Sequence, residues 1–290
     1  MIAVTGASGQ LGRLTVRRLL EHVDAARVVA LTRTPDGIDD LPVARRRADF
    51  DIPETLARAF DGAERLLIIS TNVFDSTGRR IRQHANAVRA AVRAGVGHVV
   101  YLSISRADDP GNPAAVADDH RVTELVLASS GLPYTVLRNN LYTQLILMGI
   151  DVTLATGRLL DNSGDGAIAY VTREDCAAVA AAVLAAGGYE GQRLEVTGPN
   201  ALTLADVAAL ISEFTGVSVR YVPITDEETA RELVAHGMPA PAARRFATIG
   251  TSIRRGFTGT VTSTVARITG RRPVSVAEFL ATALGVTDVP

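Results

Sequence analysis

A glycine-rich turn near the start of the chain limits the possible folds more than any other feature. An apolar run over residues 2–5 precedes this turn, and a helical pattern follows it over residues 11–20. Glycines spaced in this way allow a tight turn, let the backbone approach a phosphate and pack a helix against a strand. Free N–H groups at the helix start then face the anion. The pattern predicts a dinucleotide pyrophosphate site, although the spacing is GxxGxxG and an ordinary strand-to-helix turn is the alternative. Its members are Gly6, Ala7, Ser8, Gly9, Gln10, Leu11 and Gly12.

Strand and helix patterns alternate from this turn to about residue 140. Further strands are expected at residues 27–32, 45–47, 66–69, 98–102 and 132–138, and helices at 77–95 and 122–128. The run over residues 66–69 is apolar throughout, as in a strand buried on both faces. This rhythm predicts an α/β fold with a doubly wound parallel Rossmann sheet.

The rhythm changes beyond residue 140, where short polar turns interrupt the pattern. A helix at 174–186 and a strand at 193–197 resume it, and mostly helical patterns follow from residue 202. We therefore expect residues 1–140 to form the NADP-binding domain, with about 168–198 returning to it. Residues 141–167 and 199–290 would form a smaller, mostly helical substrate-binding lobe.

Composition removes several functional classes. The 290 residues carry a formal net charge of −1, which gives no field to attract nucleic acid or an anionic membrane. The lone cysteine, Cys176, permits neither an intramolecular disulfide nor a cysteine zinc site, and no other metal-ligand spacing occurs. Together with the absence of a leader pattern, this favours the cytoplasm. Ser8 lacks the spacing of a hydrolase nucleophile elbow. All thirty basic residues are arginine, which excludes a catalytic lysine.

Two residues bear on the adenosine half of the cofactor. Arg33 ends the second expected strand, where an acidic residue would favour NAD and an arginine can pair with the 2′-phosphate of NADP. We therefore expect NADP(H) rather than NAD(H), with a solvated arginine as the alternative and Arg13 as a second candidate. Asp49, at the end of the third strand, is expected beside the adenine.

Polar residues at the carboxyl ends of the central strands mark the other half of the site, because ligands of such sheets bind there. Ser70, Thr71, Asn72 and Ser103 are expected along the nicotinamide half of the cofactor. Hydrogen-bond donors to an acceptor oxygen are expected after the sixth strand, at Asn139, Asn140 and Tyr142. For Tyr142 a packing role beneath the second lobe is the alternative.

Several segments resemble the NmrA-like group of atypical short-chain dehydrogenases, with the strongest likeness to bacterial NADPH-dependent quinone oxidoreductases and triphenylmethane reductases. The resemblance covers most of the chain. The segments that carry it are residues 1–12, 30–33, 120–124, 130–139, 172–175 and 269–279.

The resemblance implies an enzyme that reduces quinones or polycyclic aromatic carbonyls with NADPH, by direct hydride transfer and without flavin. A tailoring oxidoreductase or monooxygenase of aromatic polyketide biosynthesis and a non-catalytic NADP-binding redox sensor are the alternatives. Asn139 matches the asparagine beside the cofactor. His120 stands where some relatives have a lysine, so it is a candidate to bind the nicotinamide ribose or donate a proton near neutral pH, or else a surface histidine at a helix start.

The expected acceptor is a small aromatic or quinone molecule, and the expected assembly is a monomer or homodimer. We assign its binding to Phe74, Asn140 and Tyr142. Further apolar cover for a flat acceptor, or alternatively core packing, is expected from Leu145, Met148 and Phe246.

Overall fold

The computed structural model describes residues 1–75 and 77–286, and its main feature is a seven-stranded sheet. The strand order is β3-β2-β1-β4-β5-β6-β8, and every neighbouring pair is parallel, which confirms the doubly wound α/β fold. The strands are β1 (Ile2–Val4), β2 (Val28–Thr32), β3 (Ala44–Arg47), β4 (Arg65–Ile68), β5 (His98–Ile104), β6 (Tyr134–Asn139) and β8 (Arg193–Val196).

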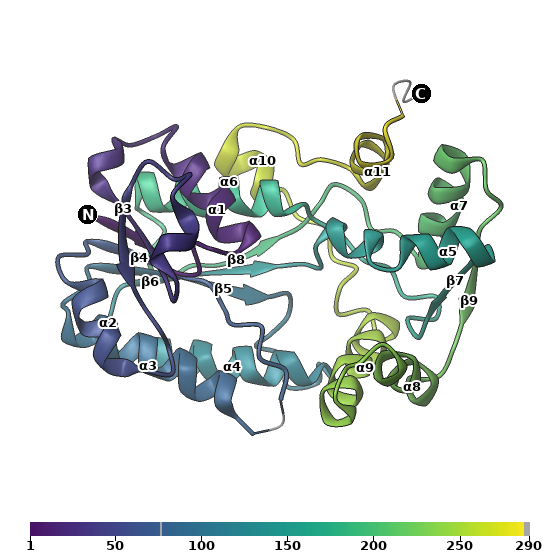
Figure 1. Ribbon diagram of the computed structural model, residues 1–290, viewed down its shortest axis with the longest axis horizontal. Helices are drawn as coiled ribbons and strands as arrows, with labels where there is room; N and C mark the ends of the chain where they lie inside the picture. The colour runs from purple at the N-terminus through teal and green to yellow at the C-terminus, as the bar shows by residue number, and fades with distance from the viewer. Residues whose placement is uncertain (76, 287–290) are drawn as a thin grey trace.

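Helices cover both faces of this sheet (Figure 1). One layer holds α1 (Gln10–Leu19), α6 (Arg173–Ala186) and α10 (Thr264–Thr269), and the other holds α2 (Pro53–Phe60), α3 (Arg79–Arg93) and α4 (Ala115–Ala128). Successive side chains of a strand point to opposite faces. Leu67 accordingly joins the core beneath α1 and α6, while Leu66 and Ile68 join the core beneath α2 and α3. This is why β4 is apolar from Leu66 to Ile68, and a Leu67→Ala change would cost about 2–5 kcal/mol.

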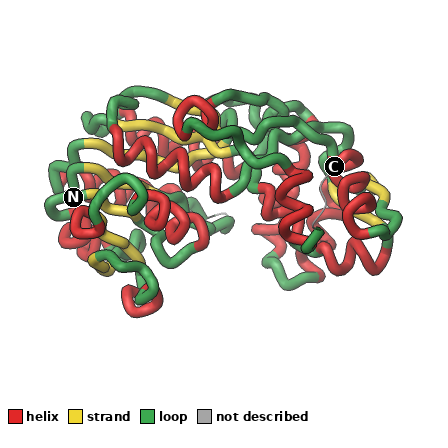
Figure 2. Tube along the Cα trace, turned by 90° about the horizontal axis from the view of Figure 1, so that it is seen from above, coloured by secondary structure: helices red, strands yellow, loops and turns green. Residues whose placement is uncertain are grey.

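A smaller lobe lies beside the sheet, and it has its own core (Figures 1 and 2). The expectation of a mostly helical lobe missed a two-stranded parallel sheet formed by β7 (Arg158–Asp161) and β9 (Arg220–Pro223). Both strands are short and only partly buried, so neither shows a continuous apolar run. The α-helices of this lobe are α5 (Ile150–Thr156), α7 (Leu204–Thr215), α8 (Asp226–Ala235), α9 (Ala240–Arg254) and α11 (Val276–Leu284). In the described chain, 3₁₀ helices occur at η1 (Ala25–Arg27), η2 (Pro35–Ile38) and η3 (Thr143–Leu147).

One helix boundary differs from the expected one in a way that matters for the site. The expected helix at 122–128 is α4, which begins seven residues earlier at Ala115. Its first turns contain Asp119 and His120, both buried, and these polar residues hid the helical pattern. The alternative of a surface histidine at a helix start is therefore wrong, because His120 is only 1% exposed and lies inside the helix.

Contacts between α4 and α9 join the small lobe to the sheet. Arg245 Nη2 donates to Asp119 Oδ2 at 2.7 Å, and the backbone N–H of Ala115 donates to Thr248 Oγ1 at 2.9 Å. A further tie follows β6, where Asn140 Nδ2 donates to Thr258 O at 2.8 Å. These bonds fix the small lobe beside the carboxyl ends of the central strands.

Candidate active site

The glycine turn has the geometry that a phosphate site requires. Gly6 adopts φ +63°, a left-handed conformation that favours glycine, and its carbonyl accepts a bond from Gly9 N at 2.9 Å. A Cβ on Gly12 would overlap the Gly6 carbonyl and Ala7 Cα, so only glycine lets α1 pack this closely. No side chain caps α1 at Gly9, and its first turn holds no acid. The helix N-terminus therefore fits an anionic pyrophosphate.

The remaining residues of the turn divide between surface and core. Ser8 and Gln10 are exposed, whereas Ala7 and Leu11 are buried against the sheet. Ser8 Oγ accepts a hydrogen bond from Thr32 Oγ1 at 2.9 Å, which ties the turn to the end of β2. The phosphate turn and the residue after β2, Arg33, are thus held side by side.

The two arginines proposed for a 2′-phosphate differ in what they contact. Arg13 Nη2 donates to Gly37 O at 2.5 Å, and its guanidinium pairs with Asp40, whose pKa this bond holds below the usual value. Arg33 is exposed and makes no hydrogen bond or ion pair within residues 1–75 and 77–286. Arg13 therefore anchors the loop after β2, whereas the Arg33 guanidinium has no such partner among the described residues.

Asp49 and the residues after β4 are held by short-range bonds. Asp49 is half-buried, and its Oδ1 accepts the Asp51 N–H at 3.0 Å, closing a turn. Ser70 and Thr71 are half-buried and Asn72 is exposed. Thr71 Oγ1 donates to Gln83 Oε1 at 2.7 Å, so α3 sets the position of this segment.

His84 connects that segment to a buried polar cluster. The Thr71 N–H donates to His84 Nε2 at 3.1 Å, which leaves the imidazole proton on Nδ1, 3.0 Å from Thr123 Oγ1. The Thr123 hydroxyl itself donates to the Asp119 carbonyl at 2.8 Å, and its oxygen can accept a hydrogen bond from the Nδ1–H of His84. Burial, followed by the charge of Arg80, lowers the pKa of His84 to about 3. The ring is neutral at pH 7.

His120 lies in the same cluster, and its bonds define its tautomer. Arg80 Nη2 lies 2.9 Å from His120 Nε2, and since an arginine only donates, Nε2 accepts. The proton of the neutral ring is then on Nδ1, 2.7 Å from Tyr101 Oη. Burial, then the charge of Arg80, lowers the pKa of His120 well below its usual value. This differs from the expected proton donor near neutral pH: His120 is neutral and holds Arg80.

Ser103 differs from its expected place beside the cofactor. It is 3% exposed, and its hydroxyl donates to Glu124 Oε1 at 2.6 Å. Glu124 also receives Arg138 Nε at 3.1 Å and Nη2 at 2.7 Å. Burial is the largest single influence and opposes the charge of Arg138, but the hydrogen bond to Glu124 and the charges of Glu124, Asp108 and Glu195 together outweigh it and raise the pKa of Arg138. The Ser103 hydroxyl therefore belongs to a buried ion pair that fastens α4 to β6.

The residues after β6 have separate tasks. Both ends of the Asn140 amide are hydrogen-bonded: its Oδ1 accepts the Leu141 N–H at 2.8 Å and its Nδ2 donates to the Thr258 carbonyl. Asn140 therefore holds the loop after β6. Asn139 Nδ2 donates to Tyr142 Oη at 3.4 Å, while Asn139 Oδ1 is buried with no partner. The Tyr142 phenol keeps its own proton to donate, and burial raises its pKa.

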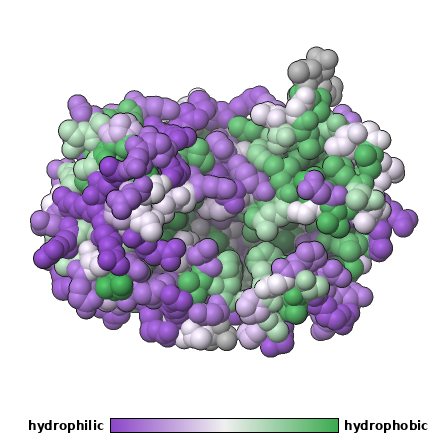
Figure 3. All heavy atoms as spheres, viewed as in Figure 1, coloured by the Kyte–Doolittle hydropathy of each residue, from purple (hydrophilic) through white to green (hydrophobic). Residues whose placement is uncertain are grey.

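Aromatic side chains from the two lobes meet at this end of the sheet. Phe74 follows β4 and Phe246 belongs to α9, with ring centroids 6.0 Å apart in an edge-to-face arrangement. Leu145 is half-buried, whereas Met148 is 72% exposed. Figure 3 shows a recess in the middle of this face, between a largely hydrophilic part and a more apolar part. Phe74 and Phe246 are thus the apolar candidates that the structure brings together.

Three residues of the buried cluster were missed from the sequence: Arg80, His84 and Tyr101. Arg80 and His84 share a helical face with Ala87 and Ala91, all buried in α3. Polar residues at apolar helix positions were the available signal.

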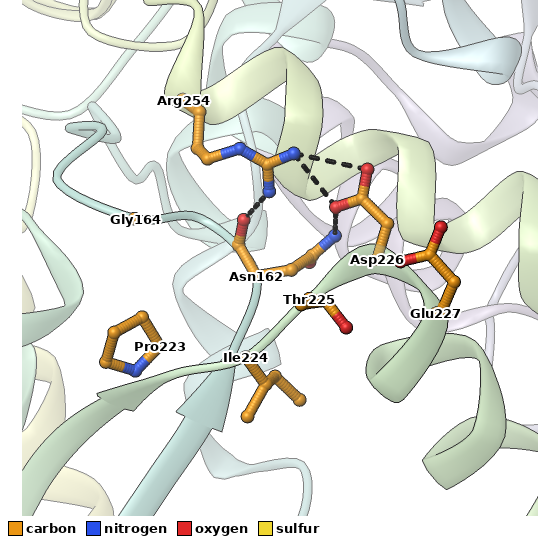
Figure 4. A pocket seen from close by; sticks show the side chains of 8 residues that line it. All are labelled: Asn162, Gly164, Pro223, Ile224, Thr225, Asp226, Glu227 and Arg254. Carbon is orange, nitrogen blue, oxygen red and sulfur yellow. Dashed lines mark hydrogen bonds and ion pairs between the residues drawn. The ribbon is translucent and has the colours of Figure 1, made fainter.

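Two surface pockets lie elsewhere. One, of about 340 Å³, is in the small lobe at the ends of β7 and β9 (Figure 4). Two of its charged residues are paired with each other, because Arg254 Nη2 donates to Asp226 Oδ1 at 2.9 Å, and Arg254 Nη1 donates to the Asn162 carbonyl. The other, of about 530 Å³, lies over β3 and α2 beside Arg47. Neither contains a predicted site residue.

Among the described residues, no group of three or more His, Cys, Asp or Glu side chains could hold a metal ion. No helix in the same part of the chain is long and apolar enough to cross a membrane. The glycine turn, the parallel strand order and the polar strand ends define a dinucleotide-binding protein of the Rossmann class.

Comparisons with known proteins agree with this class. The family described as NAD(P)H-binding matches residues 6–187. Quinone oxidoreductase 2 of Escherichia coli K12 is 34% identical over 291 aligned positions, which cover 99% of this chain and all of the relative. The crystal structure of the Escherichia coli NADPH-dependent quinone oxidoreductase QOR2 complexed with NADPH matches at 34% identity and TM-score 0.91, covering 98% of this chain and 99% of that one. The Citrobacter sp. triphenylmethane reductase complexed with NADP(H) matches at 34% identity and TM-score 0.90, covering 98% and 100%.

The chain therefore belongs to the NAD(P)H-binding family, in its NmrA-like branch of atypical short-chain dehydrogenases. The expected class of enzyme, an NAD(P)H-dependent oxidoreductase, is confirmed.

Proposed function

We propose that this protein reduces quinones or polycyclic aromatic carbonyls with NADPH, by direct hydride transfer and without flavin. The observation that carries the proposal is the full-length likeness to two reductases solved with this cofactor, one named for quinones and one for triphenylmethane dyes. Both acceptor classes are conjugated and carry aromatic or quinonoid rings. The rings of Phe74, which follows β4, and Phe246, of α9 in the small lobe, suit such a molecule.

The cofactor is assigned along the strand ends. The glycine turn receives the pyrophosphate, Arg33 pairs with the 2′-phosphate, and Asp49 lies near the adenine. Ser70, Thr71 and Asn72 line the nicotinamide half. Arg33 is the reason to prefer NADPH over NADH, because its guanidinium has no other partner among the described residues.

The chain's own residues position the acceptor and supply hydrogen bonds. When bound, NADPH supplies the hydride, so the protein needs to orient a flat acceptor and exclude water. Tyr142 donates its phenolic proton toward the acceptor oxygen, while Asn139 holds the phenol from behind. Asn140 fixes the loop that presents Tyr142, and Phe74 covers the acceptor. His120 acts as a positioning residue through Arg80.

A turnover assay tests this proposal. We expect the purified protein, with no flavin absorbance and no flavin added, to oxidise NADPH with at least one acceptor from a panel of benzoquinones, naphthoquinones and anthraquinones. NADPH should give a higher kcat/KM than NADH. An absence of turnover with every acceptor contradicts the proposal. Tight NADPH binding without turnover would then indicate the redox sensor, and oxygen uptake with an oxygenated product would indicate the tailoring enzyme. A cytoplasmic location and a monomeric or homodimeric state stay predictions.

A further inference from the structure

A buried arginine with incomplete hydrogen bonding stands beside the proposed acceptor site. Arg80 of α3 is 5% exposed. Its Nη2 donates to His120 Nε2 at 2.9 Å, whereas its Nε and Nη1 are buried with no hydrogen-bond partner among residues 1–75 and 77–286. Each unsatisfied buried donor costs about 1–3 kcal/mol, and more when it is charged. The fold therefore retains an arrangement that lowers its stability.

No acidic side chain neutralises this charge within the part of the chain that the structure describes. Asp119 is the acid whose charge most affects Arg80, but its Oδ2 accepts Arg245 Nη2 at 2.7 Å. The histidines that contact or approach Arg80, His120 and His84, are neutral because burial lowers their pKa. Arg80 is thus a buried cation whose ion-pair position is open.

The surroundings of Arg80 place it at the acceptor end of the site and not at the pyrophosphate. The Phe74 ring lies over its guanidinium, with Cζ 5.4 Å from the ring centroid, and Phe74 in turn contacts Phe246 of the other lobe. The positive charge of Arg80 also acts on the Tyr142 phenol, where it partly offsets the rise in pKa that burial causes. A shift of the Phe74 ring would expose the two unpaired donors to a molecule lying between the lobes.

We propose that Arg80 binds the carbonyl oxygen of the acceptor and stabilises the negative charge that forms on it, with His120 holding the guanidinium in place and Phe74 packing against it. This inference rests on the proposed function and adds a residue to it. Oriented donors in a dry site stabilise a developing oxyanion strongly, and a guanidinium N–H forms a charge-assisted hydrogen bond to such an oxygen.

The electron balance explains why a cation is needed here. Hydride addition to one carbonyl oxygen of a quinone would form an O–H bond as the C4–H bond of NADPH breaks and leaves NADP⁺, and the ring π electrons would shift so that the second carbonyl oxygen carries the negative charge. The immediate product is a hydroquinone monoanion, and one proton from Tyr142 or from water converts it to the hydroquinone. The negative charge exists until that proton arrives, and Arg80 faces it during this interval.

Substitution of Arg80 tests the inference. Arg80→Gln retains an N–H for His120 and removes the charge, so we expect kcat/KM for a quinone to fall about 10²-fold while NADPH affinity is unchanged. The melting temperature should stay the same or rise, because a buried unpaired charge is lost. A structural role would instead lower it. Arg89→Gln, at an exposed position of the same helix, is the matched control and should behave as the wild type. Unchanged quinone kinetics in Arg80→Gln would overturn the proposal.

The choice of acceptor separates charge stabilisation from general damage. A triphenylmethane dye is itself a cation, and hydride addition to its central carbon neutralises it without forming an oxyanion. We therefore expect Arg80→Gln to lose activity with the quinone and to retain or gain activity with the dye. Equal losses with both acceptors would contradict the assignment. Arg80→Lys, which keeps the charge with fewer oriented donors, should lie between the wild type and Arg80→Gln.

A binding measurement decides the matter even if the wild type reduces neither acceptor. Calorimetric titration of the NADP⁺-loaded protein with 4-nitrophenolate, above the pKa of the free phenol, supplies a stable phenolate as probe. Binding to the wild type that is lost in Arg80→Gln supports the inference. Equal binding to both proteins, or none to the wild type, overturns it. If the wild type binds 4-nitrophenolate, Arg80→Gln does not, and no acceptor is reduced, then the proposed function is refuted while the assignment of Arg80 stands.

Discussion

The sheet and the small lobe are built under different constraints. In the sheet, strands such as β4 are buried on both faces, and the glycine turn tolerates no side chain at Gly12. In the small lobe, β7 and β9 are partly exposed, and large apolar side chains such as Met148 and Val152 reach the surface. Backbone geometry that a dinucleotide imposes leaves a clear pattern in the sequence. Short, partly exposed strands leave a weaker one.

The largest predicted effect tests the rigidity of the sheet side. Gly12→Ala places a Cβ against the Gly6 carbonyl, so α1 must move and we expect NADPH binding to be abolished. The matched change in the small-lobe segment, Gly259→Ala, meets nothing nearer than 3.5 Å and should leave binding intact. NADPH titration by fluorescence measures both. Wild-type affinity in Gly12→Ala would show that the turn is not the phosphate site.

A smaller effect is expected where the two regions meet, at Tyr142. Tyr142→Phe removes the phenolic donor and keeps the ring, so kcat with a quinone should fall about 10²-fold. NADPH affinity should not change. Tyr134→Phe, which removes a phenol that contacts Arg193 away from the recess, is the control. Steady-state kinetics distinguish the two variants, and an equal kcat in all three proteins would remove Tyr142 from the proposed mechanism.

The sequence predicted the glycine turn of the sheet domain better than it predicted the side chains near the small lobe. The turn at residues 6–12 was recognisable because glycine spacing reports backbone geometry directly. Residues after a strand were placed at the correct end of the sheet by topology, but the sequence could not show which way their side chains point. The Ser103 hydroxyl donates to Glu124, and the Asn140 amide donates to the Thr258 carbonyl. Such choices depend on partners more than twenty residues away.

The buried polar cluster was unreadable for a related physical reason. Its members come from α3, β5 and α4, and each looks like an isolated polar residue in its own segment. Only the packing of α3 and α4 beneath the sheet brings Arg80, Tyr101 and His120 together. The same burial turned His120 from an expected proton donor into a neutral hydrogen-bond partner, because desolvation disfavours the charged imidazolium.

Cofactor preference is expected to depend on a single exposed side chain of the sheet domain. Arg33→Ala removes a charged hydrogen-bond partner of the 2′-phosphate, so kcat/KM with NADPH should fall roughly 10- to 100-fold. Activity with NADH should change little. Arg47→Ala, at an exposed position on β3 without an ion pair among the described residues, controls for loss of positive charge. An unchanged NADPH-to-NADH ratio in Arg33→Ala would refute the proposed contact.

The smallest effect concerns stability in the small lobe. Glu278 completes the capping box of α11 by accepting bonds from Ser275, and it pairs with Arg272. The bond from Arg272, then those from Ser275, lower the pKa of Glu278 from 4.5 to about 2. The folded-state pKa is depressed, so this stabilisation is present at neutral pH and is lost as pH falls from about 4.5 toward 2.

We expect Glu278→Gln to cost about 1 kcal/mol at pH 7, with the difference from wild type disappearing near pH 2. Urea denaturation across this pH range measures the difference, and NADPH affinity at pH 7 should be identical in both proteins, because α11 lies outside the cofactor site. A difference that persists undiminished to pH 2 would mean that packing of the side chain, and not its charge, stabilises the helix.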